Sequence, residues 1–215
     1  MYDIRVITSP RPYIGATIDS LLTSFGRRIS VYAEPGCETF QHANWCDVYT
    51  NPTKLGICGN WFNALRSKPI TTPYVMMCED DIEVRPGAAE LIHSFLMTAP
   101  KNLGFFSPYC AERNRPVKPG FQEARMPAKH AWCGCLCMLI PKKVAEYLIE
   151  VSDTVIKLAQ NKHLDAAIGE FLLSTRHTIW TYTPTLIMHT GEVSTDAGNN
   201  AFKYLPEVRA RTPAL

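Results

Sequence analysis

Residues 74–84, YVMMCEDDIEV, join an apolar run directly to three adjacent carboxylates. A short apolar run that follows a proline is typical of a buried strand. Glu79, Asp80 and Asp81 would then lie at the carboxyl end of that strand, where three carboxylates repel one another and raise one another's pKa. A hard divalent cation that takes oxygen ligands removes this repulsion. The alternative is a solvated acidic turn, and the rest of the chain favours the cation.

Strand and helix patterns alternate along the chain. Residues 14–25 carry one apolar stripe at helical spacing and end at Gly26, which predicts an amphipathic helix. Further helices are expected at residues 60–66, 86–97, 141–151 and 164–174. Besides the acidic strand, strands are expected at residues 4–8, 29–32, 104–107, 133–140, 178–181 and 185–188. This order predicts an α/β fold, with a mixed, mostly parallel sheet flanked by helices.

Composition narrows the class of protein. With 215 residues and no linker or repeat, the chain is expected to form a single domain, 1–215. No apolar run approaches the roughly 18 residues that span a bilayer, and the first residues do not resemble a signal peptide. We therefore expect a cytoplasmic protein, with no membrane partner and with reduced cysteines. Cys133, Cys135 and Cys137 would share one face of a strand, and core packing is favoured there over zinc.

Residues 111–131 show no periodicity and carry a surplus of basic side chains. A connection of this length in a domain is usually functional or mobile. Five cations outnumber the acids Glu112 and Glu123; they are Arg113, Arg115, Lys118, Arg125 and Lys129. Such a segment is able to follow an anionic polymer such as a phosphate backbone, although basic residues in a loop are more often plain surface.

Four segments together resemble the GT-A class of nucleotide-sugar glycosyltransferases. The first segment is the N-terminal strand, loop and helix, and the second is KLGICGNWFNAL at 54–65. The third is the three acids at 79–81, which are similar to a D-x-D motif with Glu in the first place. The fourth is the final part of the chain, with WCGC at 132–135, HLDAAIG at 163–169 and a strand that ends in His189. The resemblance implies a donor nucleotide-binding half at 1–110. It also implies an acceptor half with a C-terminal tail at 111–215.

The resemblance also implies roles for individual residues. Asp81 and His189 would hold Mn2+, or alternatively Mg2+, against the diphosphate of a nucleotide-sugar, which is expected to be UDP-linked. Asp165 would be the general base of an inverting transfer, although its position alone fits a helix-start charge equally well. The expected contacts of the nucleotide are Thr8, Arg11, Glu34, Asn60, Glu79 and Asp80.

Other functions stay open at this point. A nucleotidyltransferase also joins an α/β sheet to acid-bound metal, but residues 9–15, SPRPYIG, lack the Gly-rich basic loop expected after its first strand. A non-catalytic carbohydrate- or nucleic-acid-binding module would not need the acids together with His189 and Asp165. The acceptor is expected to be a polymeric hydroxyl compound. DNA with 5-hydroxymethylpyrimidines, as in phage-type DNA-modifying glycosyltransferases acting in a host cytoplasm, is the first hypothesis, and a glycan or protein acceptor is the alternative.

Overall fold

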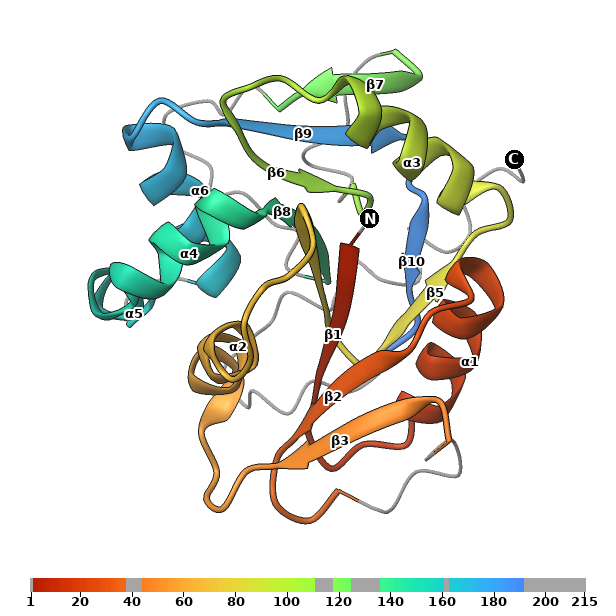
Figure 1. Ribbon diagram of the computed structural model, residues 1–215, viewed down its shortest axis with the longest axis vertical. Coiled ribbons are helices and arrows are strands. Elements are labelled where there is room, and N and C mark those ends of the chain that lie inside the picture. Colours follow the sequence, from red (N-terminus) through yellow and green to blue (C-terminus); the bar gives the residue numbers. More distant parts are fainter. Residues whose placement is uncertain (1, 38–43, 111–117, 125–135, 161–162, 192–215) are drawn as a thin grey trace.

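A mixed sheet of eight strands forms the centre of the computed structural model, which describes residues 2–37, 44–110, 118–124, 136–160 and 163–191 (Figure 1). The strand order is β3-β2-β1-β4-β8-β6-β9-β7, and only β8 and β7 run against the other six. The strands are β1 Tyr2–Thr8, β2 Ile29–Ala33, β3 Cys46–Thr50, β4 Tyr74–Cys78, β6 Leu103–Ser107, β7 Gly120–Glu123, β8 Cys137–Pro141 and β9 Thr178–Thr183. The expected mixed, mostly parallel sheet is confirmed.

Helices cover both faces of this sheet. One face carries α1 Ile14–Phe25, α3 Ala88–Thr98 and a two-stranded sheet of β5 Ile82–Val84 with β10 Ile187–His189. The other face carries α2 Gly56–Arg66, α4 Lys142–Glu150, α5 Ser152–Ala159 and α6 Leu164–Ser174. Figure 1 shows the two groups on opposite sides of the central strands. Alternate residues of a strand point to opposite faces, so Val75 and Met77 of β4 pack under the second group, while Met76 and Cys78 pack under the first.

Several element boundaries differ from the sequence expectation. Strands β3, β5 and β7 and helix α5 were not expected, and β7 lies inside the stretch 111–131 that was read as an aperiodic loop. Short strands of this kind owe their conformation to pairing with neighbours, which local sequence does not show. Helix α2 begins at Gly56 rather than at residue 60, and β10 begins at Ile187 rather than at 185. Residues 133–135 of the expected strand 133–140 lie outside the described residues.

The described cysteines are free thiols. Cys137 of β8 lies directly opposite Cys78 of β4, and their Sγ atoms are 3.6 Å apart in the core. Burial is the first cause that raises the pKa of Cys137, and the nearby Cys78 raises it further. Cys137 therefore packs as a small apolar residue, as expected, whereas Cys133 and Cys135 fall outside the described part of the chain.

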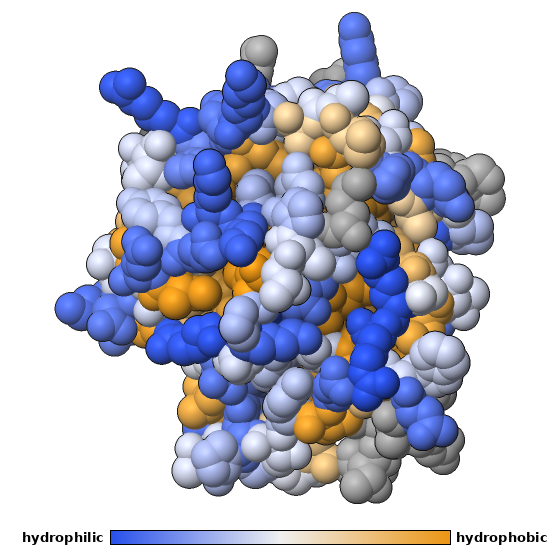
Figure 2. Space-filling view, viewed as in Figure 1, coloured by the Kyte–Doolittle hydropathy of each residue, from blue (hydrophilic) through white to orange (hydrophobic). Residues whose placement is uncertain are grey.

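The surface carries only separate apolar patches on the face that Figure 2 shows. Trp45 is the most exposed aromatic residue of the described chain, with 61% of its surface accessible, and it lies next to the edge strand β3. Isolated exposed apolar residues are common on folded proteins. Among the described residues, no helix combines the length and the apolar character needed to cross a membrane.

A fully buried arginine fastens helix α2 to the sheet. The guanidinium of Arg5, in β1, donates to the carbonyl oxygens of Ala64 and Leu65 at 2.7 Å and of Lys68 at 3.1 Å, and to Asp3 at 2.9 Å. The last carbonyls of a helix lack intrahelical partners and carry partial negative charge. Arg5 satisfies these carbonyls in a place that water does not reach, so the C-terminal end of α2 is anchored to β1.

We expect Arg5→Met to lower the free energy of unfolding by about 3 kcal/mol, because it removes a buried donor from the carbonyl oxygens of Ala64 and Leu65 and leaves Asp3 with Lys68 as its ion-pair partner. Urea unfolding at neutral pH measures this change. The matched control is Arg28→Gln, which breaks the exposed ion pair of Arg28 with Asp47 and should change stability little. An Arg5→Met protein as stable as the wild type would contradict this role.

Candidate active site

The carboxyl ends of three neighbouring parallel strands meet at one edge of the sheet. Strand β1 lies between β2 and β4, and its last residue, Thr8, is in register with Ala33 of β2. Glu34 directly follows β2, and the acidic turn Glu79-Asp80-Asp81 directly follows β4. This edge is where ligands bind in open α/β sheets. The structure therefore brings Thr8, Glu34 and the acidic turn together, as the sequence suggested.

The acidic turn is held in place by its neighbours on both sides. The hydroxyl of Thr17, buried in α1, lies 2.8 Å from the carbonyl oxygen of Asp80 and accepts the backbone N–H of Ile82 at 3.0 Å. The backbone N–H of Thr190 donates to the carbonyl oxygen of Asp81 at 2.8 Å. These bonds fix the backbone of the turn, so its carboxylates point in set directions despite their repulsion.

Asp80 is fully buried and serves as an acceptor for the first loop. Its Oδ2 accepts the Thr8 hydroxyl at 2.6 Å and the Ser9 backbone N–H at 3.2 Å, and its Oδ1 accepts the Arg11 guanidinium. Burial raises the pKa of Asp80, and the charge of Arg11 and the bond from Thr8 oppose that rise. Burial alone would lower the pKa of Arg11, but Asp80 and Asp81 raise it. Arg11 is therefore a charged partner.

Asp81 is bound directly to His189. The Asp81 Oδ2 lies 3.0 Å from the Nε2 of His189, at the end of β10, and accepts the Arg11 guanidinium at 3.0 Å. Burial works to raise the pKa of Asp81, but the hydrogen bond and charge of His189 and the charge of Arg11 lower it below its usual value. Asp81 is thus an ionised carboxylate. A Cβ on Gly191 would lie 2.3 Å from its Oδ2, so only glycine permits this approach.

These two side chains fit a divalent cation. The Oδ1 of Asp81 is buried and has no hydrogen-bond partner among the described residues, which is a costly state for a carboxylate oxygen that meets no cation. The 3.0 Å between Asp81 Oδ2 and His189 Nε2 is a hydrogen-bond distance, and it brings together two groups that can both bind one divalent cation. In the described residues, no group of three or more His, Cys, Asp or Glu side chains is arranged around one metal position. The remaining ligands would have to come from water or substrate.

Glu79, the first residue of the acidic turn, feels the charge of Asp165. Burial is the first cause that raises the pKa of Glu79 well above its usual value, and the charges of Asp81, Asp80 and Asp165 add to the rise. Asp165 is half-buried in the first turn of α6, where its Oδ1 accepts the backbone N–H of Ala166 at 2.8 Å. The structure therefore places Asp165 near enough to influence the acidic turn electrostatically, although 84 residues of chain separate it from Asp81.

A pocket of about 130 Å³ opens beside these groups. Its walls include Thr8, Arg11 and Glu79, and the predicted nucleotide contacts Glu34 and Asn60. Glu34 accepts the backbone N–H of Leu55, at the start of α2, through both carboxylate oxygens, at 3.0 and 2.9 Å. The remaining lining residues are Ile7, Ser9, Pro10, Lys54, Gly56 and Ile57. Five of the six predicted nucleotide contacts thus line one pocket, whereas the sixth, Asp80, is fully buried and does not line it.

Asn60 lies in the second turn of α2, and its amide is committed to the scaffold. Its Nδ2 donates to the carbonyl oxygen of Tyr32 at 3.0 Å and approaches that of Thr8 at 3.5 Å, and its Oδ1 accepts from Asn51 at 2.9 Å. Asn51 also accepts from Asn63 at 2.8 Å. Asn60 therefore joins α2 to the ends of β1 and β2, and a direct contact of its side chain with the nucleotide stays a prediction.

Sequence reasoning missed three residues that shape this site: Thr17, Asn51 and Gly191. Thr17 sits within the apolar stripe of its helix, and a hydroxyl in that position was the available signal. Gly191 follows His189 by two residues, but nothing in the local sequence indicates the carboxylate beside it. The basic stretch 111–131, proposed to meet the acceptor, lies mostly outside the described residues.

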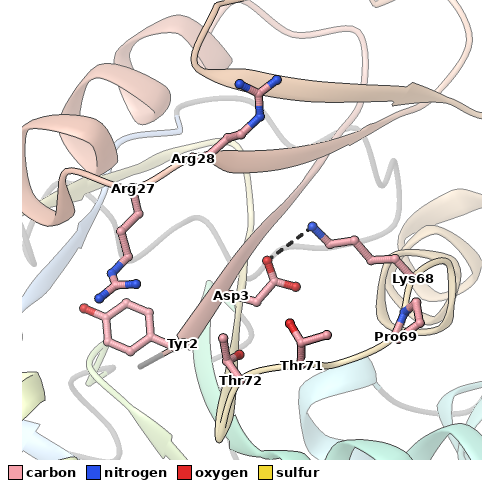
Figure 3. Close-up of a pocket in the computed structure, with 8 residues that line it drawn as sticks. All are labelled: Tyr2, Asp3, Arg27, Arg28, Lys68, Pro69, Thr71 and Thr72. Carbon is pink, nitrogen blue, oxygen red and sulfur yellow. Dashed lines mark ion pairs between the residues drawn. The ribbon is translucent and has the colours of Figure 1, made fainter.

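A larger pocket, of about 490 Å³, opens at the opposite ends of the parallel strands (Figure 3). Its cations already have partners. Lys68 pairs with Asp3 at 3.3 Å, Arg28 pairs with Asp47 at 2.6 Å, and the guanidinium of Arg27 lies 5.5 Å from the centre of the Tyr2 ring. Because its charges are compensated and it lies far from the acidic turn in the strand register, the smaller pocket is the candidate active site.

No protein-family model matches the chain, and no curated protein matches it in sequence. Among solved structures, the galactosyltransferase LgtC, in complex with donor and acceptor sugar analogues, matches with a TM-score of 0.55 at 11% identity, over 99% of this chain and 97% of that one. Glucosyl-3-phosphoglycerate synthase from Mycobacterium tuberculosis, in complex with Mn2+, UDP and phosphoglyceric acid, gives a TM-score of 0.38 at 12% identity. That match covers 49% of this chain and 42% of the synthase, less than half of its length.

The match to LgtC extends over almost the whole of both chains. It shows that this protein has the fold of GT-A glycosyltransferases. The fold expected from the resemblance is thereby confirmed, and the activity rests on the site itself.

We expect Gly191→Ala to lower the affinity for Mn2+ by about tenfold or more, a typical cost of disturbing the surroundings of a metal ligand. The added methyl group would push the Asp81 carboxylate or the His189 ring out of position. Calorimetric titration with Mn2+ measures the affinity. Gly15→Ala is the matched control, since a Cβ there meets nothing within 4 Å, and an unchanged affinity of the Gly191→Ala protein would refute the close approach.

Proposed function

We propose that this protein is a metal-dependent glycosyltransferase, which moves a sugar from a nucleotide-sugar, UDP-linked in our hypothesis, to a hydroxyl acceptor. The observation that carries the proposal is the ionised Asp81, with one buried oxygen that lacks a described partner, beside His189 and a pocket at the carboxyl edge of a GT-A sheet. The fold shared with a galactosyltransferase supports this choice of class, although fold alone does not establish activity.

The pocket offers distinct surroundings for each part of the donor. Ile7 and Ile57 provide apolar contact for a base, and Glu34 provides a carboxylate acceptor for the hydroxyl and N–H groups of a nucleoside. Arg11 provides the cation that a diphosphate requires. The sugar would extend from the diphosphate toward Glu79 and Asp165, because the charge of Asp165 acts on Glu79 and Glu79 lines the pocket.

Mn2+, or alternatively Mg2+, would be held by Asp81 and His189 and by the donor diphosphate. When bound, it neutralises the negative charge that builds up on the departing nucleoside diphosphate. A histidine among the ligands favours Mn2+ over Mg2+. The chain orients Asp81 through the backbone contacts of Thr17 and Thr190 with the turn, and His189 and Arg11 favour its ionised form.

We expect calorimetry to show that UDP binds at least about tenfold more tightly with Mn2+ than without it, because the metal and the diphosphate share ligands. Asp81→Ala and His189→Ala should remove this metal dependence. Asp19→Ala, at an exposed position of α1, is the control. Equal UDP affinity with and without Mn2+ would contradict the proposal. In a separate experiment, hydrolysis assays with a panel of sugar nucleotides would identify the donor.

Asp165 is proposed as the general base that removes the proton of the acceptor hydroxyl. Its carboxylate is half-buried, lies in the first turn of a helix and belongs to the electrostatic neighbourhood of Glu79. Attack on the anomeric carbon from the face opposite the leaving diphosphate would invert the configuration of the sugar. Burial and the neighbouring negative charges disfavour loss of the proton from Glu79, so Glu79 is poorly suited to act as the base.

Asp165→Asn should lower the transfer rate by about 10² to 10⁴, the usual contribution of a general base, and leave UDP affinity within about twofold. Single-turnover assays and calorimetry measure these two quantities. Asp153→Asn, in the first turn of α5, is a matched control for loss of a helix-start charge. A product with retained anomeric configuration in NMR would exclude Asp165 as the base of an inverting transfer.

The acceptor is proposed to be a polymer with free hydroxyl groups. DNA that contains 5-hydroxymethylpyrimidines is the first candidate, on the basic composition of residues 111–131. We expect a gel shift of duplex DNA that weakens steeply with salt, and a weaker shift when Arg113, Arg115 and Lys118 are all changed to Ala. Absence of any shift at low salt would redirect the search to glycan and protein acceptors.

A further inference from the structure

Arg11 bridges the two aspartates of the acidic turn, and one of them, Asp81, is a proposed ligand of the metal. Its guanidinium bridges Asp80 and Asp81, with Nη2 on Asp80 Oδ1 and Nη1 on Asp81 Oδ2 at 3.0 Å. Both carboxylates are buried, while the Arg11 side chain keeps 11% of its surface exposed. A single flexible side chain thus supplies much of the positive charge that compensates these two acids.

The same Asp81 oxygen takes part in both arrangements. Asp81 Oδ2 accepts from Arg11 and lies 3.0 Å from His189 Nε2, the atom that would bind a metal. A divalent cation there would lie next to the guanidinium, and two positive centres at such a separation repel each other strongly in buried surroundings. Arg11 and the metal therefore compete for the carboxylate of Asp81.

The neighbouring pocket offers Arg11 a second binding partner. It belongs to the loop between β1 and α1, residues 9–13, and forms part of the wall of the candidate nucleotide pocket. A diphosphate in this pocket offers the guanidinium bidentate phosphate acceptors in place of the two carboxylate oxygens that it binds, one from each aspartate. The ring of Tyr13, in the same loop, lies 5.9 Å from the guanidinium.

We infer that Arg11 is an internal counter-cation that keeps the metal site closed until a nucleoside diphosphate draws it away. The diphosphate takes the guanidinium, Asp81 then becomes available to the metal, and the metal in turn holds the diphosphate. Metal and nucleotide thereby strengthen each other's binding, and by linkage the factor is the same in both directions. This inference rests on the proposed function, because it presupposes that both ligands bind at this edge.

Calorimetric titration with Mn2+ in the absence and presence of saturating UDP tests the inference. In the wild type, UDP should tighten Mn2+ binding by about tenfold or more. In Arg11→Gln, Mn2+ binding without UDP should be about fivefold tighter than in the wild type, UDP should bind more weakly, and the effect of UDP on Mn2+ should shrink below about threefold. Mn2+ alone should also raise the melting temperature of Arg11→Gln more than that of the wild type.

Arg28→Gln is the matched control, because it breaks an Arg–Asp ion pair remote from the acidic turn, and it should behave as the wild type. If Arg11→Gln fails to fold, Arg11→Lys decides: an ammonium cannot bridge both aspartates as a guanidinium does, so Mn2+ should bind tighter without UDP. If the wild type binds both UDP and Mn2+ but the Arg11 variant binds Mn2+ no more tightly than the wild type does, this inference is overturned and the proposed function stands. A wild type that binds neither UDP nor Mn2+ overturns the proposed function together with it.

Discussion

The parallel pairing of β1 with β2 on one side and β4 on the other is the constraint on which the site depends. Parallel neighbours end at the same edge of a sheet, so residues far apart in sequence, such as Thr8, Glu34 and Asp80, become neighbours in space. An antiparallel arrangement of these strands would separate them by the full strand length. The backbone hydrogen bonds of this three-stranded unit therefore determine which side chains can act together.

Collecting so many carboxylates at one edge creates an electrostatic cost that the protein offsets in three different ways. Asp80 is neutralised by hydrogen bonds and by Arg11, Asp81 by His189 and Arg11, and the pKa of Glu79 is raised chiefly by its burial. The three adjacent acids therefore have different roles. One carboxylate organises the loop, one stays ionised for a cation, and one is disposed to keep its proton.

The alternation of apolar periods predicted the main sheet and the helices α1, α3 and α6, because these segments bury continuous faces. Strand β3, with its exposed Val48 and Tyr49, and β7, inside a proline-rich stretch, were missed because pairing rather than local pattern defines them. In the site, the acidic turn was visible in sequence, and His189 and Asp165 emerged through family resemblance. The bridge from Arg11 to both aspartates depends on a loop conformation, which no spacing along the chain encodes.

Helix α2 is fastened at both of its ends. Arg5 binds its last carbonyls, while Glu34 and Asn60 tie its first two turns to the ends of β2 and β1. One wall of the pocket is thus fixed to the scaffold, and we infer that adaptation to a ligand falls to the loop at residues 9–13, which Asp80 and Asp81 hold in this structure. Lys54 and Ile57 lie exposed at the start of the rigid wall. Substitutions at these two positions can therefore change ligand preference while the framework beneath them stays unchanged.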